Sequence, residues 1–190
     1  MELPEDPHYF IGIPAPSFVE EQLAKWQEIL SPHVNYKRWM HPEDFHITLK
    51  FLGSVTEEKL RVIQEKLAAL TVPSALQLQI TGVNFFGKEE QPRVMYAEVA
   101  PNDALNHLHQ VVEEEMEALG FDVERRPYRP HLTLAKKWAK DKLHFGADVL
   151  TNHLEMDGPI EYTANEMNLY IVKPTQEKKY DVITTYPLRT

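Results

Sequence analysis

Two copies of one short pattern, FHITL at residues 45–49 and PHLTL at residues 130–134, stand out in this 190-residue chain. Their histidines are His46 and His131, and 131 − 46 = 85 residues separate them. Each copy alternates polar and aliphatic residues, which is the period of a β-strand with one buried face. A single His-x-Thr pair carries little information, but two copies with matched aliphatic positions indicate a duplicated unit. The pattern therefore predicts two equivalent lobes whose motif strands face each other across a cleft.

The histidine and the threonine of each motif share one face of the strand, because successive side chains point to opposite sides. If the lobes face each other, His46 and Thr48 meet His131 and Thr133 in one cavity. Imidazole titrates near pKa ~6.5, so at neutral pH one ring can act as a base while the other acts as an acid. Threonine hydroxyls can donate hydrogen bonds to phosphate oxygens. The set predicts metal-independent cleavage of a phosphodiester, with base and acid on opposite sides of phosphorus.

The rest of the chain interleaves helical and strand patterns. Three amphipathic helices are predicted, from a capping box at Ser17 and Glu20, from Thr56, and from about Asn102 to Gly120. Several predicted strands follow one another directly, which favours an α+β fold with antiparallel sheets flanking a central cleft and helices outside. Residues 87–92 are expected to form a hairpin loop, and residues 136–159 are the least regular part. The predicted strands are residues 9–13, 45–52, 76–80, 93–99, 131–135, 167–172 and 180–185.

Length and composition limit the possible functions. The length favours a single two-lobed domain over residues 1–190. The chain has no cysteine, which excludes disulfides, thiolate metal sites and a cysteine nucleophile. It has no apolar run long enough to span a bilayer, and its acidic, proline-containing start is not typical of a secretory signal, so we expect a cytoplasmic protein.

The net charge of −9 constrains any role on nucleic acid. A protein that follows a long nucleic acid usually carries a basic face, because phosphate neutralisation supplies most of the affinity. We therefore expect this chain to grip an RNA end or a few nucleotides, with positive charge concentrated locally.

No other set of residues predicts a metal or cofactor site. His107 and His109 are two apart on a predicted helix, so they point in different directions and do not form the usual helical ligand pair. The chain has no phosphate-binding glycine loop and no Gly-x-Ser-x-Gly elbow. We expect neither a metal ion nor a cofactor.

Taken together, these stretches resemble the two-histidine phosphoesterases, in particular the bacterial RNA 2′,3′-cyclic phosphodiesterases, also called 2′-5′ RNA ligases. The resemblance runs over about residues 9–188 and is most specific at residues 38–39, 45–53 and 126–134. It implies the two-lobed fold with a central cleft and metal-free opening of 2′,3′-cyclic phosphates. It also implies that His46 protonates the leaving 3′ oxygen while His131 activates water, which gives a 2′-phosphomonoester.

The implied partners are RNA ends or nucleotides that carry the cyclic phosphate, and we expect a monomer. Reverse joining to a 5′-hydroxyl follows from microscopic reversibility, but it should be minor because water is abundant.

Positive charge beside the second motif predicts the phosphate anchor. Lys136 lies where relatives often carry arginine, and lysine offers a point charge in place of a bidentate fork. Arg126, Arg129 and Lys50 are further candidates. The aromatic candidates suit either stacking on a base or packing in the core; they are Tyr128, Phe10 and Trp39.

Two alternatives remain open. The substrate could be a small cyclic nucleotide or an ADP-ribose cyclic phosphate, which the acidic charge favours over long RNA. The chain could also be a nucleotide-binding module without turnover, although two intact His-x-Thr units argue against that.

Overall fold

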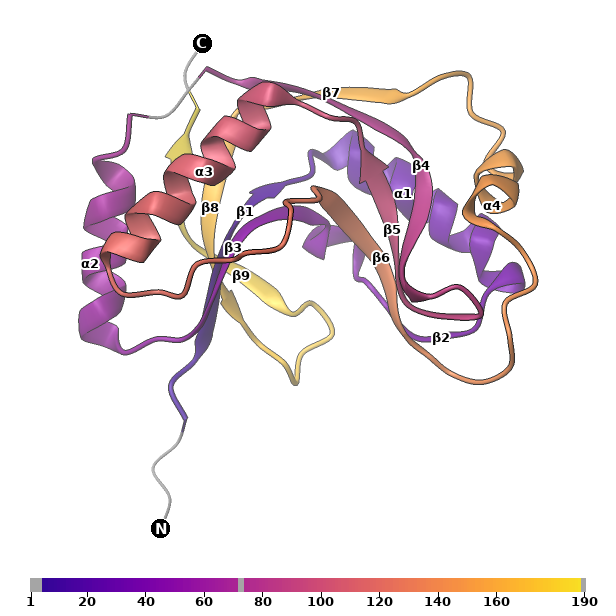
Figure 1. The fold of residues 1–190 in the computed structure, drawn as a ribbon, viewed down its shortest axis with the longest axis horizontal. Helices are drawn as coiled ribbons and strands as arrows, with labels where there is room; N and C mark the ends of the chain where they lie inside the picture. Colours follow the sequence, from indigo (N-terminus) through magenta and orange to yellow (C-terminus); the bar gives the residue numbers. More distant parts are fainter. Residues whose placement is uncertain (1–4, 72–73, 189–190) are drawn as a thin grey trace.

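The computed structural model describes residues 5–71 and 74–188, which form one antiparallel sheet of nine strands and four α-helices (Figure 1). The predicted α+β class with antiparallel pairing is confirmed. In chain order the elements are β1 (His8–Pro14), α1 (Ser17–Leu30), the 3-10 helix η1 (Ser31–His33), β2 (Tyr36–Trp39), the 3-10 helix η2 (Pro42–Asp44), β3 (His46–Ser54), α2 (Glu57–Ala68), β4 (Leu76–Lys88), β5 (Gln91–Val99), α3 (Asp103–Ala118), β6 (His131–Trp138), α4 (Ala147–His153), β7 (Ile160–Ala164), β8 (Glu166–Val172) and β9 (Tyr180–Pro187).

The two motif strands lie next to each other in the middle of the sheet. Its order is β7-β4-β5-β6-β3-β1-β8-β9, and β2 adds to β6. Among the described residues, β3 and β6 pair through one register position, Ile47 opposite Leu132. We call these two residues the central pair. The sequence predicted strands facing each other across a gap, whereas the structure joins the two half-sheets edge to edge through the central pair.

The chain crosses between the two halves several times. Helix α1 follows β1 but contacts α4, which packs on β4, and α3 follows β5 but packs on β3. Figure 1 shows α2 and α3 on one side of the molecule and α1 and α4 on the other. Neither half is a continuous stretch of sequence. Each half contains segments that are separated along the chain by segments of the other half.

Two of the three predicted helix starts are confirmed. Thr56 caps α2 by accepting a hydrogen bond from the amide of Lys59, and Asn102 caps α3 by accepting one from Leu105. The capping box at Ser17 is wrong: Pro16 occupies the N-cap position without a side-chain hydrogen bond, and Ser17 is the first helical residue. Gly120 follows α3 with φ +95°, a conformation that glycine adopts at low cost after a helix.

The sequence patterns did not predict every element of the fold. Strands β2 and β7 and helix α4 were not predicted, and the stretch expected to be irregular contains both α4 and the end of β6. The three unpredicted elements have four, five and seven residues, which is too short for a periodic signal to accumulate. Among the described residues, no helix is both long and apolar enough to cross a membrane.

A β-bulge follows each motif. In the β1–β3 pairing Gly12 lies opposite Thr48 and Ile11 opposite Lys50, so one residue, Leu49, is extra. In the β5–β6 pairing Tyr96 lies opposite Thr133 and Met95 opposite Ala135, so Leu134 is extra. A bulge inserts one residue into one strand and therefore reverses which side chains face which side beyond it.

The bulges decide which residues after each motif face the same side of the sheet as the motif threonines. Residues directly opposite each other in a sheet project from the same face. Lys136 pairs with Val94, and both line the same cleft as Thr133. On β3, Lys50 turns to the buried side beside Ile11, while Phe51 shares the face of Phe10. Strict alternation would have placed Lys136 and Phe51 on the buried side.

Leu132→Ala tests how far the sheet depends on the central pair. Leu132 is fully buried, so we expect its truncation to lower the free energy of unfolding by about 2–5 kcal/mol. Urea unfolding followed by circular dichroism measures the change. Phe18→Ala, at a side chain that is 51% exposed, is the matched control and should stay within about 0.5 kcal/mol of the wild type. A loss of less than about 1 kcal/mol for Leu132→Ala would contradict a tightly packed join.

Candidate active site

The four motif residues gather around the central pair. Ile47 and Leu132 are fully buried, so the neighbouring motif side chains project from the opposite face of the sheet. Continuing the antiparallel register by one residue sets His46 opposite Thr133 and Thr48 opposite His131. The two His-x-Thr units are thus related by a pseudo-twofold axis through the central pair.

Both imidazoles are oriented by the same backbone contact. The Nδ1–H of His46 donates to the carbonyl oxygen of Asp44, and that of His131 donates to the carbonyl oxygen of Arg129, each at 2.7 Å. A carbonyl oxygen only accepts, so Nδ1 carries the proton in both rings, and Nε2 of the neutral ring keeps its lone pair. The Nε2 of His46 lies 2.9 Å from the hydroxyl oxygen of Thr48. Two equivalent Nε2 atoms are therefore available for proton transfer.

Aromatic rings from neighbouring strands hold the His46 ring in place. Phe10 lies 4.6 Å from it, and Tyr180 meets it edge-on at 5.1 Å. Phe10 itself stacks on Tyr170 at 4.7 Å. Gly12 makes room for this packing, because a Cβ there would lie 2.9 Å from the carbonyl oxygen of Ile47 and 3.3 Å from His46 Cδ2.

His131 has its own aromatic neighbours, Phe86 at 4.9 Å and Tyr96 at 5.1 Å. In both motifs, therefore, a backbone carbonyl binds one ring nitrogen, and aromatic side chains limit rotation of the imidazole.

Burial and nearby positive charge disfavour protonation of both histidines. Burial is the main cause that lowers the pKa of His46 to about 4, and His131 and Lys136 lower it further. Burial also lowers the pKa of His131, with Lys136 contributing again. The pKa of Lys136 is lowered by burial and by Arg38, Lys137 and Lys179. At neutral pH the two imidazoles are therefore neutral, in a positive surrounding that favours an anion.

A cleft of about 820 Å³ opens over the second motif and the end of the first. Five predicted binding residues line it together with Thr48, His131 and Thr133; they are Lys136, Arg126, Arg129, Lys50 and Tyr128. The side chain of Arg126 is exposed and forms a two-pronged contact with Glu124, with Nη2 2.8 Å from Oε2 and Nε 2.9 Å from Oε1.

Phe10 does not line this cleft. Its ring is 3% exposed beneath His46, so its position suits support of the imidazole and does not suit stacking on a base.

One wall of the cleft contains a polar network that the sequence did not predict. Tyr128 stacks on His109 at 3.7 Å, and its hydroxyl donates to the carbonyl oxygen of Thr48 at 2.9 Å. His109 lies 3.8 Å from Glu113, which also binds the buried ammonium of Lys50 at 3.0 Å. Lys50 donates to the carbonyl oxygen of Asp122 as well, at 2.6 Å. Lys50 thus links β3 to α3. The sequence analysis considered His109 only as a metal ligand with His107, so it did not predict the contact of His109 with Tyr128.

A buried carboxylate supports the first motif. The side chain of Asp44 is fully buried and accepts hydrogen bonds from the backbone amides of Lys179, at 2.6 Å, and Tyr180, at 3.2 Å. Lys178 lies 3.8 Å from the same carboxylate. Asp44 therefore fixes the β8–β9 turn against His46. Nothing in the local sequence indicated this contact, since its partners are about 135 residues away.

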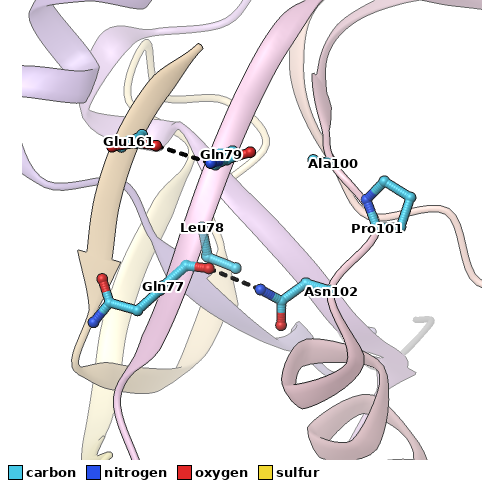
Figure 2. A pocket seen from close by; sticks show the side chains of 7 residues that line it. All are labelled: Gln77, Leu78, Gln79, Ala100, Pro101, Asn102 and Glu161. Atoms are coloured by element: carbon cyan, nitrogen blue, oxygen red, sulfur yellow. Dashed lines mark hydrogen bonds between the residues drawn. The ribbon is translucent and has the colours of Figure 1, made fainter.

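A second hollow, of about 200 Å³, is lined by residues of β4, of β7 and of the segment between β5 and α3 (Figure 2). The amide of Gln79 donates to Glu161 at 2.8 Å, and the amide of Asn102 donates to the carbonyl oxygen of Gln77 at 2.7 Å. The side chain of Gln77 accepts a hydrogen bond from Thr163, and neither motif histidine lines this hollow. Within residues 5–71 and 74–188, no three acidic or histidine side chains gather closely enough to share a metal ion.

We expect an anion in the cleft to raise the pKa of both histidines. Sulfate keeps a constant charge over this pH range, so its binding should shift the titration of His46 upward from about 4. Lys136→Met removes a positive charge and should shift both titrations upward even without sulfate. NMR titration of the imidazole resonances measures both effects. Lys25→Met, at an exposed lysine of α1, is the control, and equal histidine titrations in all three proteins would exclude the charge coupling.

Comparison with known proteins assigns the family. Residues 14–174 match the sequence model of the 2′-5′ RNA ligase superfamily. An RNA 2′,3′-cyclic phosphodiesterase from Bacillus subtilis is 33% identical over 187 residues, which is 96% of this chain and 97% of that protein. One from Geobacillus stearothermophilus is 34% identical over 182 residues, covering 95% of this chain but 57% of that protein.

Solved structures support the same fold. The crystal structure of E. coli LigT complexed with 3′-AMP has a TM-score of 0.75 at 19% identity, covering 98% of this chain and all of that one. TT0787 of Thermus thermophilus has a TM-score of 0.70 at 24% identity, covering 96% of this chain and 98% of that one. With the family match over most of its length, this chain belongs to the 2′-5′ RNA ligase superfamily.

Proposed function

We propose that this protein is an enzyme that hydrolyses RNA 2′,3′-cyclic phosphates to 2′-phosphomonoesters without a metal ion. The observation that carries the proposal is the meeting of two His-x-Thr units around the central pair, each imidazole presenting its Nε2 on the same face. The names of the relatives from B. subtilis and G. stearothermophilus support this substrate class.

In the proposed step, the neutral Nε2 of His131 accepts a proton from water as the water oxygen bonds to phosphorus. The bond between phosphorus and the 3′ oxygen breaks, and that oxygen takes a proton from the Nε2 of His46. The product carries a 2′-phosphate and a 3′-hydroxyl. His131 ends protonated and His46 neutral, and exchange of one proton with solvent restores the pair. Thr48 and Thr133 donate hydrogen bonds to the non-bridging oxygens, where charge develops.

The substrate itself supplies the charge that makes His46 an acid. Burial, with a smaller contribution from Lys136 and from coupling to His131, lowers the pKa of His46 to about 4, so this ring is neutral at pH 7 before a phosphate binds. A bound phosphate brings a negative charge between the two rings, which favours the protonated form of one of them. Binding of the cyclic phosphate is therefore coupled to proton uptake, and an empty site does not hold a charged imidazole.

Lys136 is the proposed anchor of the phosphate, with Arg129 and Arg126 along the cleft wall. Tyr128 positions the backbone of Thr48 through its hydroxyl. We further propose that the enzyme works as a monomer in the cytoplasm and acts on RNA ends. The reverse reaction, 2′-5′ ligation, is proposed to be minor.

Replacement of either motif histidine tests the chemistry. His46→Ala and His131→Ala should each lower turnover of a short RNA with a 2′,3′-cyclic phosphate end by about 10²–10⁴-fold, because each variant loses one proton-transfer group. The assay contains EDTA, and mass spectrometry with separation of 2′ and 3′ isomers identifies the product. His107→Ala, on the adjacent helix, is the control. Turnover that survives in either motif variant would rule out the paired mechanism.

The same preparations distinguish the substrate classes. A cyclic mononucleotide, ADP-ribose cyclic phosphate and an oligomer with the same cyclic end are compared by kcat/KM. Preference for the oligomer supports RNA ends as the substrate, and preference for either small molecule replaces that part of the proposal. Accumulation of ligated over hydrolysed RNA at dilute ends would reverse the expected ranking of the two reactions.

A further inference from the structure

The phenol of Tyr128 connects the two motifs of the proposed active site. Its hydroxyl donates a hydrogen bond to the carbonyl oxygen of Thr48 at 2.9 Å. Burial raises the pKa of this phenol, so the hydroxyl keeps the proton that it donates. The next residue along the chain, Arg129, is the one whose carbonyl oxygen orients His131 at 2.7 Å. The hydroxyl of Tyr128 therefore helps to set where the first-motif backbone lies relative to the second-motif imidazole.

The ring of Tyr128 is held in turn by His109 of α3. The two rings lie flat against each other, with their centroids 3.7 Å apart and their planes 5° apart. Of the ring pairs among the described residues, this one is the closest and the most nearly parallel. The imidazole therefore limits tilting of the phenol and keeps its hydroxyl within reach of Thr48.

A buried ion pair fixes the position of His109. Glu113, four residues further along, lies on the same face of α3 and binds the ammonium of Lys50 on β3 at 3.0 Å. The side chains of Lys50 and Glu113 are 8% and 13% exposed, and that of His109 is 16% exposed. Burial is the main cause that lowers the pKa of His109, so its ring is neutral at pH 7 and stacks as an aromatic ring. The ion pair thus holds α3 on β3, two residues from Thr48.

We infer that His109 is a positioning residue of this site: its stack on Tyr128 keeps the phenol hydroxyl on the carbonyl oxygen of Thr48. The inference rests on the proposed function, and it adds a residue of α3 to those that support the motifs. In the proposed step Thr48 donates to a phosphate oxygen where charge develops, so its placement affects turnover more than ground-state binding. His109 acts through Tyr128 and takes no part in proton transfer.

Steady-state kinetics on a short RNA with a 2′,3′-cyclic phosphate end separate positioning from folding. His109→Ala should lower kcat by about 10- to 100-fold, because a misplacement of about 1 Å can cost about 10²-fold. KM should change by less than about threefold, since the lost interaction forms mainly in the transition state. His107→Ala, at an exposed histidine of the same helix, is the matched control and should behave as the wild type. Urea unfolding checks that each variant is folded under the assay conditions, and a wild-type kcat in folded His109→Ala would overturn the inference.

Two further variants test whether His109 acts through the ring and the hydroxyl of Tyr128. His109→Phe restores a flat ring without the imidazole nitrogens, so its kcat should stay within about threefold of the wild type. Tyr128→Phe keeps the stack but removes the hydroxyl, and it should lower kcat to a similar extent as His109→Ala. Adding His109→Ala to Tyr128→Phe should then cost less than about threefold more, since both changes act on one hydrogen bond. Multiplicative losses, or a His109→Phe variant as slow as His109→Ala, would contradict the positioning role.

The carbonyl carbon resonance of Thr48 in NMR spectra tests the same contact without turnover. This resonance responds to the hydrogen bond that the carbonyl oxygen accepts, so it should move in Tyr128→Phe and in His109→Ala. It should keep its wild-type position in His109→Phe and His107→Ala. An unmoved resonance in His109→Ala overturns the inference. A wild type that turns over no cyclic phosphate would instead refute the proposed function, and the resonance would still decide whether His109 holds Tyr128 on Thr48.

Discussion

The contact between Ile47 and Leu132 is the constraint on which the rest of the molecule depends. It is the register position through which the described half-sheets meet, and its two side chains are fully buried. One residue to either side of it lies a motif histidine or threonine, so the packing that joins the halves also sets the relative positions of the proposed catalytic groups. A shift of one residue in either strand would turn the motif side chains of that strand toward the core.

Packing on one face and chemistry on the other are coupled by long-range polar contacts. Asp44 connects the start of β3 to the turn before β9, and Lys50 connects β3 to α3 through Glu113. Buried charges are costly unless they are paired or hydrogen-bonded, and both of these groups are. They hold the first motif from two sides, which keeps the His46 ring against Phe10 and Tyr180.

The electrostatics of the cleft explain how an acidic protein can take a phosphate. Net charge is −9 overall, yet Lys136 has Arg38, Lys137 and Lys179 near enough to lower its pKa. These residues come from β2, from β6 and from the turn before β9, so the positive region exists only in the folded chain. A local site of this kind suits an RNA end better than the length of a polynucleotide, because extended binding draws on a continuous basic face.

The sequence alone determined the antiparallel α+β class and the equivalence of the two motifs, and it pointed to the four residues of the proposed acid–base site, because alternation and repetition are local signals. Only the tertiary structure decided that the motif strands are neighbours and that Lys136 and Phe51 face the cleft, since a bulge becomes visible only against a paired strand. It likewise decided that Phe10 is buried while Tyr128 positions Thr48. The roles of Asp44 and His109 depend on partners far away in sequence or in another element, and no spacing within the chain encodes such contacts.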